Sequence, residues 1–233
     1  MKNKYLMVIN RGFTLSEVLI TLVIIGIIAA ITVPVIHANY TEQERISRVK
    51  KAYSVLANAM TRIKAKGGDA AYIIDESGDM DTMKEWFSTY FAPMITTKVC
   101  YATSGCWYNG KTKQLDGDYF TALGGTWGLG SGTIMFVLND GTTVSFDDSS
   151  RSQVKTYFGV DLTDTDTTYT ITMFFDINGT KSPNTMGKDV FAVVYDTKRG
   201  LVPAYADRTK AQINTDCSNS GTGISCIQKY LKK

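Results

Sequence analysis

The feature that most constrains this chain is an apolar stretch, residues 13–36, that contains a single ionisable side chain. That side chain is Glu17, and the next ionisable residue is His37. A helix over this stretch would be about 36 Å long, enough to cross the roughly 30 Å hydrocarbon core of a bilayer. Burying a carboxylate in such a helix costs about 2.5 kcal/mol or more, so Glu17 is a candidate functional residue.

Residues 1–12 form a basic segment before the apolar stretch, with Lys2, Lys4 and Arg11 and no acidic side chain. Basic residues at this position stay in the cytoplasm, which predicts that the rest of the chain lies outside it. Without these three residues the 25 basic side chains fall to 22, equal to the 22 acidic ones. A neutral remainder argues against nucleic acid as a ligand, and none is expected as a partner.

An ordinary secretory signal peptide is the alternative interpretation of the N-terminus. Its apolar core spans roughly 7–15 residues and is followed by a cleavage site with small side chains. Here the apolar run is longer, and apolar residues continue after Ala29-Ala30. We therefore favour a membrane helix that is retained.

The junction between the basic and apolar segments reads Gly12-Phe13-Thr14-Leu15-Ser16-Glu17. With the apolar run, it resembles the leader-peptidase site of bacterial type IV pilins and type II secretion pseudopilins. By position, the resemblance implies cleavage after Gly12 and methylation of the new amino terminus at Phe13. It also implies that Glu17 pairs with the amino terminus of a neighbouring subunit during assembly, and that Pro34 bends the helix.

The resemblance covers roughly residues 1–36 and implies a structural subunit rather than an enzyme. Such a subunit belongs to a type II secretion pseudopilus or a type IV pilus. It first lies in the bacterial inner membrane as a single-pass protein with its head outside the cytoplasm, then in a periplasmic or surface filament. Its partners are prepilin peptidase, other pilin or pseudopilin subunits, the inner-membrane assembly platform and membrane lipid. The alternative is a minor pilin that acts as a tethered adhesin or a DNA-uptake component.

After His37 the pattern becomes that of an amphipathic helix, which we expect to end at Gly67-Gly68. The apolar side chains on one stripe are spaced by 3 and 4 residues, which fits a helix packed on its own sheet or, alternatively, a coiled-coil seam. They are Ile46, Val49, Tyr53, Leu56, Met60 and Ile63. The expected parts are a removed leader (1–12), a transmembrane and assembly helix (13–36), its amphipathic continuation (37–67) and an extracytoplasmic globular head (68–233).

The head reads as one short helix followed by strands. Asp81 is a candidate cap for the helix, which Pro93 ends. Strands are expected at 133–138, 142–146, 169–175 and 190–195, the first two joined by a hairpin turn, with a polar loop between 146 and 169. The prediction is an α+β, pilin-like fold in which one long N-terminal helix packs on an antiparallel β-sheet head.

Cys100, Cys106, Cys217 and Cys226 are the four cysteines. Outside the cytoplasm an even number indicates two disulfides, with three pairings allowed. Short separations favour Cys100–Cys106 and Cys217–Cys226. Without a C-x2-C pair or a second histidine, no metal site is predicted.

Catalysis has little support, because one histidine cannot supply a Ser-His or Cys-His dyad in the exported head. We identify no catalytic residue and expect no cofactor. Residues 105–112 match the phosphate-loop pattern but precede a poor helix start, so a hairpin turn fits better. The loop 176–189 carries oxygen side chains that suit calcium, yet Lys181 and Gly187 depart from the calcium-loop pattern, and turn chemistry is the simpler interpretation.

Overall fold

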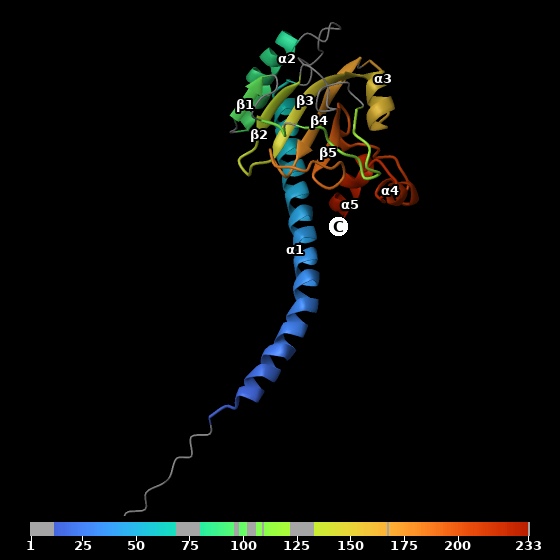
Figure 1. Ribbon diagram of the computed structural model, residues 1–233. Coiled ribbons are helices and arrows are strands. Elements are labelled where there is room, and N and C mark those ends of the chain that lie inside the picture. The colour runs from blue at the N-terminus through green and yellow to red at the C-terminus, as the bar shows by residue number, and fades with distance from the viewer. Residues whose placement is uncertain are drawn as a thin grey trace, which may run out of the picture. The chain divides into compact units, whose positions relative to one another are not determined.

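The computed structural model describes residues 12–68, 80–95, 98–101, 106–108, 110–121, 133–166 and 168–232. The chain divides into two compact units, Met1–Glu44 and Arg45–Lys233. Helix α1, Leu15–Ala65, contributes to both (Figure 1).

The N-terminal unit contains the first part of α1, in which apolar side chains are exposed on all sides. Leu15, Ile25 and Ile31 are 80%, 62% and 66% exposed. Within it, Leu15–Pro34 is long and apolar enough to cross a membrane. A helix that is apolar all round needs an apolar environment, supplied by lipid or by other helices.

Helix α1 ends where its glycines predict. The backbone N–H of Gly68 donates to the Ile63 carbonyl at 3.0 Å, and that of Gly67 donates to Lys64 at 2.9 Å. These two hydrogen bonds form a Schellman motif, whose residue after the helix takes positive φ. Gly67 has a φ of 73°, which glycine adopts without steric cost.

In the second unit, the last turns of α1 supply one wall of the hydrophobic core. The predicted stripe is buried along Ile46, Val49, Leu56, Met60 and Ile63. The Tyr53 hydroxyl, at the edge of the stripe, donates to the Leu201 carbonyl at 2.6 Å. The stripe is therefore a core face packed on the sheet of its own chain.

The second unit contains a six-stranded sheet in which every neighbouring pair is antiparallel and the order follows the sequence. The register places Phe136 opposite Val144 and Phe175 opposite Phe191. This meander confirms the predicted α+β class. The strands are β1 Lys98–Tyr101, β2 Ile134–Val137, β3 Thr143–Ser150, β4 Tyr169–Asp176, β5 Val190–Asp196 and β6 Gly200–Pro203.

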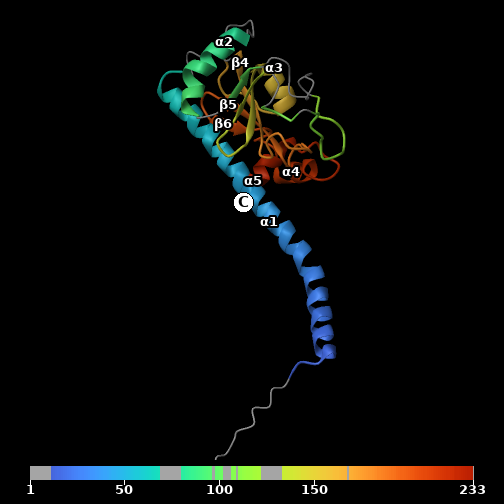
Figure 2. The same ribbon diagram turned by 60° about the vertical axis from the view of Figure 1, so that its left-hand side comes forward.

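Both faces of the sheet are covered (Figure 2). On one face, α1 and helix α2 (Met80–Trp86) pack with the π-helical turn Phe87–Phe91 against residues such as Phe136 and Phe146. On the other, Val154 and Phe158, which follow the short helix α3 (Arg151–Gln153), pack against Phe174. Strands β4 and β5 are accordingly buried on both faces.

The polar loop predicted between 146 and 169 was wrong as far as Phe158, where strand β3, helix α3 and a π-helical turn stand instead, whereas residues 159–166 have no regular secondary structure, as predicted. Strand β3 continues to Ser150, which pairs with Tyr169, because Ser149 and Thr172 satisfy each other across the strands at 2.9 Å. Ser150 then caps α3 in a capping box with Gln153. The C-terminal segment adds helices α4 (Lys210–Asp216) and α5 (Ile227–Lys232).

Candidate functional site

The first turn of α1 forms a capping box. The Glu17 carboxylate Oε2 accepts hydrogen bonds from the Thr14 backbone N–H and the Thr14 hydroxyl, both at 2.8 Å. The Thr14 hydroxyl in turn accepts from the Glu17 N–H at 3.2 Å. Thr14 is thus the N-cap and Glu17 the third helical residue, where the helix dipole also favours a negative charge.

Sequence analysis missed the part played by Thr14. The pattern T-x-x-E directly before an apolar run is a capping-box signal and would have identified it. The capping box gives the Glu17 carboxylate two hydrogen-bond donors, both from Thr14. Residues 12–36 contain no basic side chain that could pair with its charge. A carboxylate with local donors costs less to hold in an apolar environment than a bare one.

The Gly12–Phe13 bond lies just before the helix. Residues 12–14 have no regular secondary structure, and Phe13 is 89% exposed. A Cβ added to Gly12 would meet nothing within 4 Å, and its φ is not in the left-handed region. The described structure therefore makes no demand for glycine at this position.

The other polar residues of the apolar segment suit a membrane environment. The Thr21 hydroxyl donates to the Val18 carbonyl at 2.9 Å, and the Thr32 hydroxyl donates to the Ile28 carbonyl at 2.8 Å.

Pro34 lies inside α1 and lacks the backbone N–H that would continue the helical hydrogen-bond pattern. A bend at Pro34 stays a prediction.

The four cysteines form two short-range disulfides. Cys100 bonds Cys106 and Cys217 bonds Cys226, with Cα–Cα distances of 6.0 and 5.5 Å. The carboxylate of Asp216 lies beside the second disulfide, but both sulfurs are bonded to each other and are not available as metal ligands.

Asp216 instead organises the C-terminal loop closed by that disulfide. Its carboxylate accepts from the Thr222 hydroxyl at 2.7 Å and the Ser225 hydroxyl at 2.6 Å, and Arg208 lies 3.3 Å away. Burial opposes ionisation, but these hydrogen bonds hold the pKa of Asp216 below its ordinary value. The group is a structural anion.

The loop 176–189 contains oxygen atoms that are candidate calcium ligands. Asp176 is fully buried, its Oδ2 has no hydrogen-bond partner among the described residues, and burial raises its pKa to about 8. The Asn178 amide, however, donates to the carbonyls of Lys181 and Pro183, so these oxygens are already engaged in turn closure. The carboxylate of Asp189, at the other end of the loop, lies near enough to Asp176 to raise the pKa of Asp176 further. Calcium binding there stays a prediction.

Comparison with known proteins gives one match at the N-terminus. The family model of the prokaryotic N-terminal methylation motif matches residues 7–33. No curated protein and no solved structure matches the chain. The matched span includes Gly12 and Phe13 as well as Thr14 and Glu17, which form the capping box. The chain therefore carries the N-terminal methylation motif that is the signature of type IV pilins and pseudopilins.

Proposed function

We propose that this chain is a structural subunit of a type II secretion pseudopilus or a type IV pilus, assembled through α1. The observation that carries the proposal is an apolar helix, exposed all round, that begins with a capped carboxylate inside the matched motif. Such a helix is suited first to lipid and then to a bundle of identical helices.

Cleavage after Gly12 by prepilin peptidase creates an amine at Phe13, which is then methylated. The Thr14 N–H lies on the mature side of the cut, so the capping box survives cleavage. In the filament, Glu17 of one subunit pairs with the Phe13 ammonium of a neighbour, which compensates two charges that are costly to bury alone. A wrong register leaves both unpaired, so the pair selects register as well as stabilising the assembly.

The location follows from the same segment. The basic leader keeps residues 1–12 in the cytoplasm, α1 holds the subunit in the inner membrane, and the head lies outside. Two disulfides fit an oxidising compartment. Its partners are the peptidase, other subunits and the inner-membrane assembly platform. A secretion pseudopilus is favoured, and a minor pilin serving adhesion or DNA uptake is the alternative.

The leader assignment is tested with Gly12→Lys, followed by immunoblotting of membrane fractions in cells that contain prepilin peptidase. We expect the variant to remain an uncleaved membrane precursor, because a long side chain replaces the glycine at the cleaved bond. Asn10→Lys adds the same charge to the leader and should be cleaved as the wild type is. Normal processing of Gly12→Lys would contradict the assignment.

A further inference from the structure

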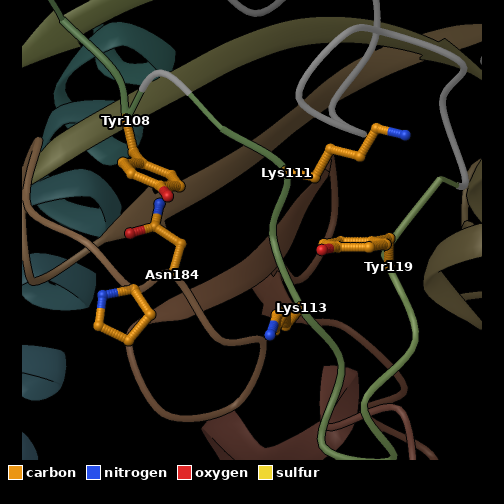
Figure 3. A pocket seen from close by; sticks show the side chains of 6 residues that line it. Tyr108, Lys111, Lys113, Tyr119 and Asn184 are labelled. Atoms are coloured by element: carbon orange, nitrogen blue, oxygen red, sulfur yellow. The ribbon is translucent and has the colours of Figure 1, made fainter.

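A cavity of about 340 Å³ lies on the head, between segments that are far apart in the sequence. This size is within the range of small-ligand sites. Of the described residues that line it, two are cationic and none is acidic, so together they contribute positive charge. The lining residues are Tyr108, Lys111, Lys113, Tyr119, Pro183 and Asn184 (Figure 3).

Backbone hydrogen bonds hold the walls of this cavity together. The Lys113 N–H donates to the Asn184 carbonyl at 2.9 Å, and the Met186 N–H donates back to the Lys113 carbonyl at 2.7 Å. The Phe120 N–H donates to the Thr112 carbonyl at 2.9 Å, which ties the segment carrying Tyr119 to the lysines. The cavity is therefore preorganised, and a ligand need not order these segments on binding.

Asn184 supplies a buried amide to the cavity wall. It is 1% exposed, and neither its amide nitrogen nor its amide oxygen makes a hydrogen bond of normal geometry to a described residue, although the side chain lies near enough to the Asp176 carboxyl to stabilise its charged form. Its side chain and that of Tyr108 turn their polar ends toward one another (Figure 3). An amide offers a donor and an acceptor together, which is the complement of a pair of ligand hydroxyls.

The rings of Tyr119 and Tyr108 already contact other groups of the protein. The Lys111 and Lys113 ammonium nitrogens lie 5.5 and 6.0 Å from the Tyr119 ring centroid, within cation–π distance. A Cβ added to Gly110 would lie 2.4 Å from the Tyr108 ring, so the backbone approaches that ring closely. These contacts leave less ring surface for a stacked nucleic-acid base, which disfavours such a ligand.

We propose that this cavity binds an acidic sugar, a hexuronate unit of a glycan. A sugar carboxylate pairs with Lys113, and hydroxyls of the same unit hydrogen-bond to Asn184 and Tyr108. The Lys111 ammonium lies on the other side of the Tyr119 ring and pairs with the carboxylate of a neighbouring hexuronate unit (Figure 3). The motif at 105–112 thus contributes its lysine without being a phosphate loop, because described residues 110–121 contain no helix whose N-terminus would hold phosphates. This proposal is independent of assembly through α1.

The test is isothermal titration calorimetry of the full chain in detergent micelles with tri-galacturonic acid. The double variant Lys111→Gln/Lys113→Gln should bind about tenfold more weakly or worse, since it loses the charged hydrogen-bond donors. Lys50→Gln/Lys66→Gln removes the same charge from exposed positions, one on α1 and one just after its end, and should bind as the wild type does. Binding should also weaken as salt is added.

Four outcomes would overturn the proposal. The first is that tri-galacturonic acid does not bind, and the second is that neutral maltotriose binds equally well. The third is that the two double variants weaken binding equally. The fourth is tighter binding of an octathymidylate strand or a tetra-aspartate peptide, which would assign the cavity to nucleic acid or to an acidic protein segment. Because the assay uses isolated subunits, filament assembly does not affect its result.

Discussion

At the residue scale, Glu17 has two separable properties. Its carboxylate oxygen accepts hydrogen bonds from Thr14. This interaction caps the helix within one chain and does not depend on a neighbouring subunit. The charge of Glu17 has no basic partner in residues 12–36, which is the property that a neighbouring amine would satisfy. A neutral glutamine keeps the acceptor but not the charge.

Replacing Glu17 separates these two properties. Both Glu17→Gln and Glu17→Ala should be inserted and cleaved, because neither touches the Gly12–Phe13 bond, yet both should be absent from filaments sheared from cells. Immunoblotting of sheared and membrane fractions measures this. If the glutamine variant assembles normally, charge pairing is not the basis of assembly.

Asp176 gives a pH dependence of head stability. Its folded-state pKa is raised by burial to about 8 from an ordinary value of 3.8, so the unfolded chain releases this proton at lower pH than the folded one. The stability of the head should therefore fall as the pH rises from about 4 to about 8. Asp176→Asn removes this titration.

In thermal unfolding with a calcium chelator present, Asp176→Asn should raise Tm relative to the wild type more at pH near 8 than at pH near 4.5. Asp118→Asn, at an exposed aspartate, should show no such change. A Tm difference for Asp176→Asn that is the same at both pH values would contradict the raised pKa.

At the element scale, most helices and strands with a clear sequence signal were predicted. Helix α1 and strands β4 and β5 follow from long apolar or β-branched runs, and the end of α1 follows from its glycines. Strand β2 is only four residues long but adjoins a recognisable hairpin turn, whereas β1 and β6, of the same length, lack such a signal and were not predicted. The end of β3 contains Asp147 and Asp148, which read as loop, and only its partner β4 makes it a strand.

The packing of α1 on the sheet predicts a large effect at Leu56, which is fully buried. Leu56→Ala should lower the free energy of unfolding of the head by about 2–5 kcal/mol, through lost burial and a cavity. Asn58→Ala, two residues away and exposed, should change it by less than about 0.5 kcal/mol. Urea unfolding followed by tryptophan fluorescence measures both, and equal small effects would favour the coiled-coil alternative.

At the scale of the whole molecule, the two sites differ in how far sequence reveals them. The proposed assembly site is local: Gly12, Phe13 and Glu17 lie within six consecutive residues at the start of α1, so a short sequence motif is enough to identify them. The head cavity joins Lys111 and Lys113 to Asn184 through backbone pairing between distant segments. No spacing between residues in the sequence predicts that contact, and it becomes visible only in the folded structure.

The central claim is that the mature chain begins at Phe13. Mass spectrometry of the N-terminal peptide, from protein purified out of cells that contain prepilin peptidase, tests it most directly. We expect a peptide that starts at Phe13 and carries one methyl group on its amine. A peptide that starts at Met1, or one that starts after Ala30 as in secretory cleavage, would contradict it.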